Sequence, residues 1–371
     1  MMKMSKTQNN YKNKSHLNNN ENNNVSPEQY FNAHCPEDNY MPIIMPKQNR
    51  IVIFGDIHGD FQLLRKLLIM SGVAFEINGK FVWKGEQSYV VQVGDQIDRC
   101  RLDQGHKCNI PNDENSDIKI LELFTDLDKQ ARQKNGRVIS LLGNHELMNV
   151  DGFLQYVSPE GFKGFDKFGN RFNAFKPGKH FAKFLGCTRL PAAIIGSHLF
   201  VHGGIINSML GVLAQNKTNV PDLELIAHYI RKWLLGDSQR SYISHLLEAS
   251  ERSMFWTRLL GNLEPGLKLS DARCVGNISD VLSTFKINDI IIGHTPQSFK
   301  YADSINSTCD NKVWRVDVGS SAAFDNFDNT YLQTKQRNVN RNPQYLEILN
   351  DNEYLVYRLE NDNKITVLKF N

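Results

Sequence analysis

Five short apolar segments of this chain each end in Asp, Asn or His beside glycine, and this recurrence limits how the chain can fold. The first, IVIFGDIHGD, covers residues 51–60. Glycine lets the backbone turn sharply and approach a bound anion, and open α/β sheets build their sites at the carboxyl ends of strands. We therefore expect the five ends to form one site. They are GDIHGD (55–60), GDQIDR (94–99), GNHE (143–146), VHGG (201–204) and GHT (293–295).

Short apolar strands alternate with amphipathic helices along most of the chain, which indicates an α/β fold. Further strands are expected over residues 313–321 and, as a C-terminal β-meander, over residues 345–370. Asp60 and Ser116 are candidate N-terminal caps. The expected helices cover residues 61–70, 116–134 and 223–235.

Residues 1–47 differ from the rest because they contain segments rich in Asn and Lys and nearly devoid of aliphatic side chains. Such segments bury too little apolar area to offset the entropy lost on ordering. We therefore predict a disordered tail over residues 1–47 and one folded domain over residues 48–371.

The overall charge excludes some partners. The chain has 43 Lys and Arg against 40 Asp and Glu, a balance that predicts neither a nucleic-acid nor a membrane-surface partner. No apolar run approaches the length of a membrane span, and the N-terminus lacks the apolar region of a secretory signal. Its 6 cysteines are dispersed without disulfide-like spacing. These features predict an intracellular, cytoplasmic protein with reduced cysteines.

The strand ends supply six candidate metal ligands, which comprise two carboxylates, one amide and three imidazoles. Such a mixed set of nitrogen and oxygen ligands suits Mn, Fe or Zn better than Ca or Mg. The absence of cysteine argues against a structural zinc site. Two cations about 3.5–4 Å apart would lower the pKa of a shared water and would clamp a phosphate ester, so the set predicts phosphoester hydrolysis. The candidates are Asp56, His58, Asp95, Asn144, His202 and His294.

The five motifs, in this order, resemble those of calcineurin-like metallophosphoesterases and, within them, of the phosphoprotein phosphatase family. The resemblance covers residues 50–320. The segments SMFWTRLLG (253–261), IIGHTPQ (291–297) and VWRVDVGSS (313–321) further resemble the bacterial-type, Shewanella-like branch of protein phosphatases. The resemblance implies a central β-sandwich flanked by helices in α/β/β/α layers, and a catalytic domain over residues 48–371 with two divalent metal ions.

The resemblance also implies a role for each ligand. Asp56 and His58 would bind the first metal, and Asp95 would bridge the two. The second metal would be held by Asn144, His202 and His294.

The remaining roles concern proton transfer and phosphate binding. His145 would be the general acid, paired with Asp98, because a nearby carboxylate favours the imidazolium form. Arg99 would grip the phosphate as a bidentate fork together with Asn144, and Arg258 is a candidate second phosphate-binding arginine.

One position departs from the family pattern GDxxDRG, since Cys100 stands where the pattern has glycine. Cysteine resists backbone angles that glycine allows, so the local turn is expected to differ. The segment of residues 100–117 is expected to form a loop on the substrate side. Cys100, His106 and Cys108 could instead hold an extra zinc ion, although a flexible loop is favoured because no fourth ligand is evident.

The leading hypothesis is a protein phosphatase that hydrolyses phospho-Ser/Thr or phospho-Tyr in a phosphoprotein or phosphopeptide, by direct attack of a hydroxide held by both metals. The main alternative keeps the metals but acts on a dinucleoside polyphosphate or a small phosphoester. Asp98 favours the first hypothesis, because related dinucleotide hydrolases tend to lack that carboxylate. A non-catalytic scaffold is disfavoured because none of the candidate ligands is missing.

Overall fold

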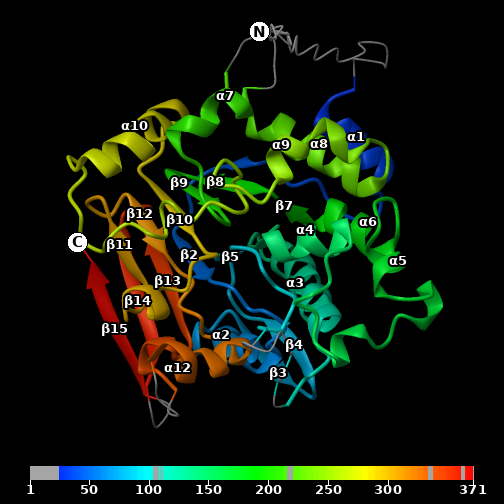
Figure 1. The fold of residues 1–371 in the computed structure, drawn as a ribbon, viewed down its shortest axis with the longest axis horizontal. Coiled ribbons are helices and arrows are strands. Elements are labelled where there is room, and N and C mark those ends of the chain that lie inside the picture. Colours follow the sequence, from blue (N-terminus) through cyan, green and yellow to red (C-terminus); the bar gives the residue numbers. More distant parts are fainter. Residues whose placement is uncertain are drawn as a thin grey trace, which may run out of the picture.

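Two large β-sheets lie between helices in the computed structural model (Figure 1). The structure describes residues 25–102, 108, 110, 112–214, 220–332, 337–360 and 364–370. The six-stranded sheet within these ranges contains, in spatial order, β1 (Ile44–Met45), β8 (Ala192–Ile195), β9 (His198–Val201), β10 (Asp289–Ile292), β12 (Val313–Arg315) and β11 (Asn306–Thr308). The seven-stranded sheet contains β15 (Ile365–Phe370), β14 (Glu353–Leu359), β13 (Gln344–Leu349), β2 (Arg50–Phe54), β5 (Tyr89–Gln92), β6 (Arg137–Leu141) and β7 (Arg189–Leu190). A separate hairpin joins β3 (Ala74–Ile77) to β4 (Lys80–Trp83).

Helices cover the outer faces of both sheets, with α7 to α10 at the top of Figure 1 and α2 at its bottom. In chain order the helices begin with α1 (Pro27–His34), α2 (Phe61–Met70), α3 (Asp117–Arg132), α4 (Asn144–Asp151), α5 (Arg171–Phe175) and α6 (His180–Thr188). The later ones are α7 (Leu210–Leu213), α8 (Leu223–Leu235), α9 (Ser244–Leu247), α10 (Ala272–Phe285), α11 (Gln297–Lys300) and α12 (Asp325–Leu332).

Strand β2 shows why the sequence is apolar without alternation at the centre of the seven-stranded sheet. Ile51 and Ile53 pack into the core that this sheet shares with the six-stranded sheet. Val52 and Phe54 point the other way, into a second core with α2 and α3. Successive side chains of a strand face opposite sides, so a strand covered on both sides is apolar throughout. The predicted arrangement of a β-sandwich flanked by helices is confirmed.

Most of the expected elements are present with small shifts of their ends. Helix α8 spans Leu223–Leu235 as predicted, and the predicted meander consists of β13, β14 and β15, each antiparallel to the next. Asp60 caps α2 by accepting a hydrogen bond from the backbone N–H of Leu63 at 2.9 Å. Ser116 does not cap α3, because its hydroxyl donates instead to the carbonyl of Gly59 at 2.6 Å.

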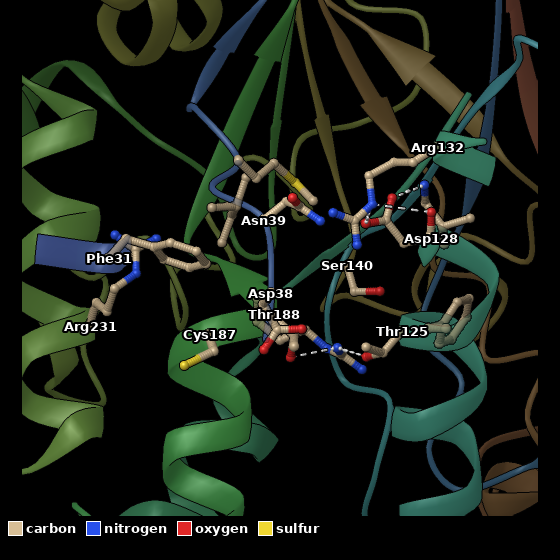
Figure 2. A pocket seen from close by; sticks show the side chains of 15 residues that line it. Phe31, Asp38, Asn39, Thr125, Asp128, Arg132, Ser140, Cys187, Thr188 and Arg231 are labelled. Atoms are coloured by element: carbon tan, nitrogen blue, oxygen red, sulfur yellow. Dashed lines mark hydrogen bonds and ion pairs between the residues drawn. The ribbon is translucent and has the colours of Figure 1, made fainter. Parts of the chain in front are cut away.

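The disordered tail predicted for residues 1–47 is wrong in its second half, while residues 1–24 lie outside the described residues. Helix α1 begins with a reciprocal capping box between Ser26 and Gln29. Phe31 is only 1% exposed, and β1 pairs in parallel with β8. Figure 2 shows Phe31 on the wall of a small cavity, together with Thr125 and Asp128 of α3 and Cys187 of α6. Phe31 packs in a small apolar cluster with Cys35 and with Leu235 of α8, and such contacts order this segment despite its polar composition.

The expectation of reduced cysteines is also wrong. The structure pairs all of them, as Cys35 with Cys187, Cys100 with Cys108, and Cys274 with Cys309. Two of these pairs are separated by 152 and 35 residues, so only the fold reveals them. The Cys100–Cys108 bond leaves no thiolate for the alternative zinc site, whose His106 lies outside the described residues. The cytoplasmic location loses this support and stays a prediction.

Within the described ranges, none of the helices combines the length and the apolar character that a bilayer span requires.

Replacing Phe31 with alanine tests whether the N-terminal segment belongs to the folded domain. Because Phe31 is 1% exposed, we expect Phe31→Ala to lower the free energy of unfolding by about 3 kcal/mol. Urea denaturation followed by circular dichroism measures the change. The control is Phe153→Ala, at a position 57% exposed, which should change stability by less than about 0.5 kcal/mol. Equal, small effects of both substitutions would show that α1 contributes nothing to the core.

Candidate metal centre and active site

The strand ends meet because the strands that precede them are parallel. Strands β2, β5 and β6 are parallel neighbours in one sheet, and β9 is parallel to β10 in the other. The carboxyl ends of parallel strands lie at the same edge, where sites of α/β sheets are built. The residues that follow these five strands include the six candidate ligands, each of which is at most 5% exposed. They are Asp56, His58, Asp95, Asn144, His202 and His294.

Asp95 lies at the middle of this group. One carboxylate oxygen is 3.3 Å from Nε2 of His202, and the other is 3.7 Å from Nε2 of His58. Asp56 lies 3.7 Å from the same His58 nitrogen, and the side-chain oxygen of Asn144 lies 2.9 Å from Nε2 of His202. The structure therefore brings these residues together as the motifs predict, with Asp95 between two histidine-containing halves.

Among the described residues, two sets of three offer ligand atoms within 4.8 Å of one another, and Asp95 is common to both. One set contains His202 and His294, and the other contains His58 and His145. His145, which the sequence predicted as the general acid, thus lies in the same cluster as the candidate ligands. Asp56 belongs to neither set but adjoins His58.

The histidines are oriented as metal ligands usually are. A metal-binding imidazole commonly donates its other N–H to a carbonyl or carboxylate, which fixes the ring and its tautomer. Nδ1 of His58 lies 3.3 Å from the carbonyl of Ile97, and Nδ1 of His202 lies 2.8 Å from that of Val93. Nε2 of His294 lies 3.0 Å from the carbonyl oxygen of Trp256. Each ring therefore keeps its second nitrogen available as a ligand.

The electrostatics of the cluster also fit bound cations. Burial lowers the pKa of both His58 and His294 well below the usual value, so both rings are neutral, the form that binds metal. Burial and then the neighbouring charge of Asp317 raise the pKa of Asp56 well above its usual value. Asp317 is itself 2% exposed, and its Oδ2 has no hydrogen-bond partner among the described residues. Adjacent buried carboxylates with an unpaired oxygen are the environment that a divalent cation stabilises.

The backbone is strained at the same positions. His58, Asp95, Asp98 and His294 have φ values of 46°, 55°, 70° and 66°, in the left-handed region that residues other than glycine rarely adopt. Such strain persists only where the surroundings enforce it, and it gathers at functional sites. A Cβ atom at Gly143 would lie 2.1 Å from Oδ1 of Asp95, so only glycine allows this close approach.

Glu146 supports that tight turn. Its carboxylate accepts hydrogen bonds from the backbone N–H groups of Asp95 at 3.0 Å, Gln96 at 2.8 Å and Gly143 at 2.7 Å. It joins the end of β5 to the end of β6 and thereby sets the direction of the Asp95 side chain.

His145 and Asp98 form the predicted pair. Nδ1 of His145 lies 2.9 Å from Oδ2 of Asp98, which leaves Nε2 directed at the cluster, 3.8 Å from Asp95. The other oxygen of Asp98 accepts from Nδ2 of Asn149 at 2.9 Å and from Arg171 at 3.4 Å. Sequence reasoning missed Asn149 and Arg171. Asn149 follows His145 by one helical turn, which is a usable signal, but nothing local marks Arg171.

A cavity of about 460 Å³ opens onto the cluster. Arg258 lines it as predicted, and its Nη1 donates to the carbonyl oxygen of His294. Arg99 does not line it and faces a separate cavity beside Glu114. Arg101, which sequence reasoning passed over, lines the cavity in its place. The lining also contains aromatic side chains, namely Tyr156, Trp256, Phe299, Phe324 and Phe327.

Comparison with known proteins agrees with this geometry. A family model described as calcineurin-like phosphoesterase matches residues 49–298. The chain belongs to the calcineurin-like phosphoesterase family. The predicted family is thus confirmed. Proteins of this family are phosphoester hydrolases that use divalent metals.

Individual proteins with similar sequences or structures were also found. An uncharacterized protein of Acanthamoeba polyphaga mimivirus is 36% identical over 233 residues, which cover 56% of this chain and 91% of the relative. Shewanella-like protein phosphatase 2 of Arabidopsis thaliana is 26% identical over 350 residues, covering 82% and 80%. A solved structure of a cold-active protein tyrosine phosphatase superposes with a TM-score of 0.63 at 21% identity, covering 88% of this chain and 81% of that one. Because this chain and the solved structure are only 21% identical, their similarity shows a shared fold alone.

Substitution of Asp95 tests the cluster as a metal centre. We expect Asp95→Asn to lose most of its bound metal after loading with Mn²⁺, because the position serves both halves of the cluster. Elemental analysis of the desalted protein measures the content. The matched control is Asp128→Asn, another buried aspartate that bonds Arg137 and the backbone of Val138 and should keep the wild-type metal content. Equal metal content in both variants would contradict the assignment.

Proposed function

We propose that this phosphoesterase is a metal-dependent protein phosphatase that acts on phosphomonoesters, with phosphotyrosine as its best substrate. The observation that carries the proposal is the His145–Asp98 pair, whose histidine adjoins the candidate metal ligands on the wall of one cavity. The proposal is supported by the names of two similar proteins, a Shewanella-like protein phosphatase and a cold-active protein tyrosine phosphatase. Phosphoproteins or phosphopeptides would be the partners.

The chain supplies two adjoining places for cations. Asp56 and His58 would hold one, Asp95 would contact both, and the second would be held by Asn144, His202 and His294. When bound, two such cations lower the pKa of water and neutralise the charge of a phosphoryl group. The donor set is compatible with Mn, Fe or Zn. The buried carbonyl contacts of the three imidazoles keep the ligands in place, so little reorganisation is needed when the ester binds.

His145 would deliver the proton that the leaving group needs. Its Nδ1 is bonded to Asp98, so the proton on Nε2 can pass to the ester oxygen as its bond to phosphorus breaks. Asp98 stabilises the protonated ring, and Asn149 and Arg171 hold Asp98 in position. Water attacks phosphorus directly in this scheme, so no phosphoenzyme forms.

The cavity wall favours an aromatic ester. Trp256 and Tyr156 lie on it near the histidines, and phenylalanine side chains continue the surface. Flat aromatic walls stack on a phenyl ring and leave its phosphoryl group at the polar end. A nucleobase presents a similar face, so a dinucleoside polyphosphate is the second candidate substrate.

The general-acid role predicts a dependence on the leaving group. His145→Asn should lower kcat on phenyl phosphate by about 100- to 10,000-fold and lower it much less on p-nitrophenyl phosphate, whose leaving group needs little protonation. Steady-state kinetics on both esters measures the ratio, and elemental analysis should show unchanged metal content. The control His180→Asn replaces an exposed histidine and should behave as the wild type. An equal loss on both esters, or loss of the metal, would count against proton donation.

A panel of substrates tests the specificity. We expect kcat/KM on a phosphotyrosine peptide to exceed that on matched phosphoserine and phosphothreonine peptides by at least about tenfold, given the aromatic wall. All activity should disappear with a chelator and return with Mn²⁺. A preference for diadenosine tetraphosphate would replace the proposal with the second candidate, and activity without metal would refute the mechanism.

A further inference from the structure

The arginine that the motif assigns to the substrate phosphate is engaged elsewhere. Nη1 of Arg99 donates to the carbonyl oxygen of Gly59 at 3.0 Å and to the carboxylate of Glu114 at 3.1 Å. The same nitrogen lies 3.7 Å from Asp60. Because these partners lie at the start of α2 and in the loop before α3, Arg99 lines a different cavity from the candidate metal ligands.

A second arginine occupies the place that Arg99 leaves. Arg101 is 8% exposed and lines the same cavity as His58, Asp95 and His145. Its Nη1 donates to the carbonyls of Asp98 at 3.0 Å and Cys100 at 2.7 Å. One nitrogen is therefore anchored to the main chain, and the other two nitrogens carry the remaining donors of the guanidinium fork.

Two aromatic rings pack against this guanidinium group. Its central carbon lies 4.6 Å from the ring centroid of Phe324 and 5.7 Å from that of Tyr156. Tyr156 also contacts the His145 ring, at 5.0 Å between centroids. A cation packed against ring faces loses little freedom when it binds an anion.

Cys100, which replaces the glycine of the family pattern, fixes the chain between the two arginines. Cys100 is fully buried, and its backbone N–H donates to the carbonyl of Tyr156 at 2.9 Å. Its sulfur forms a disulfide with Cys108. These contacts hold the main chain at Cys100 in the conformation in which its neighbour Arg101 lines the cavity.

We propose that Arg101, and not Arg99, binds the phosphoryl group of the substrate. The inference rests on the proposed function, since it concerns the same cavity. Arg101 and Arg258 come from separate segments and both line the cavity, so both guanidinium groups are available to a phosphoryl dianion bound there.

The test measures binding of inorganic phosphate to the Mn²⁺-loaded full chain by calorimetry, together with KM and kcat on phenyl phosphate. Arg101→Gln should weaken phosphate binding and raise KM by about 10- to 100-fold, because a charge-assisted contact is lost. Arg101→Lys, which keeps the charge without the fork, should recover part of the affinity. Arg65→Gln, an exposed ion-paired arginine on α2, is the matched control and should bind phosphate as the wild type does.

Arg99→Gln decides between the two assignments. The proposal requires phosphate affinity within about twofold of wild type in Arg99→Gln, since Arg99 contacts other residues. Weakened binding in Arg99→Gln with normal binding in Arg101→Gln would overturn it. Thermal denaturation of each variant shows whether folding is intact, and Arg101→Lys serves if the glutamine variant does not fold. A wild type that binds phosphate but hydrolyses no ester would refute the proposed function alone, while the binding isotherms would still test Arg101.

Discussion

The candidate active site depends on the position of one carboxylate. Asp95 lies within 3.3 to 3.8 Å of the ring nitrogens of His202, His58 and His145, which come from three different strand ends. Its main chain has positive φ, its N–H is held by Glu146, and Gly143 is close enough to exclude any side chain. Burial alone would raise the pKa of Asp95, but the surrounding histidines outweigh it and keep that pKa well below the usual value. A buried, ionised carboxylate among three histidine rings is the basis of a shared cation site.

The proton-transfer half of the site is built on a separate set of contacts. Asp98 follows Asp95 by three residues and points to the other side, where Asn149 and Arg171 hold it. Arg171 is completely buried and also pairs with Asp117 at the start of α3 at 2.8 Å. Helices α3, α4 and α5 therefore converge on one carboxylate. Asp95 and Asp98 thus both follow β5, but Asp95 lies among the candidate metal ligands and Asp98 contacts Nδ1 of His145.

The sequence predicted those parts of the molecule whose cause is local. Apolar strands ending in Asp, His and Asn predicted the six converging residues, because the ends of parallel strands lie at one edge of a sheet. The layers and the His145–Asp98 pair were implied by the resemblance to a known family. Prediction from the sequence failed where the cause is long-range. The segment of α1 looks too polar to fold, because its sequence does not show that Phe31 packs against Leu235 of α8. The disulfide partners of Cys35 and Cys274 are likewise distant in sequence. Arg99 fits the motif, but the contacts around Cys100 direct Arg101 into the cavity instead.

Electron paramagnetic resonance of the wild-type chain titrated with Mn²⁺ tests the central claim most directly. Two ions that share Asp95 would lie about 3.5–4 Å apart and would be magnetically coupled. We expect a multiline signal from a coupled pair of Mn²⁺ ions that saturates at about two ions per chain. A signal from isolated Mn²⁺ at every ratio, or saturation at a single ion, would contradict it.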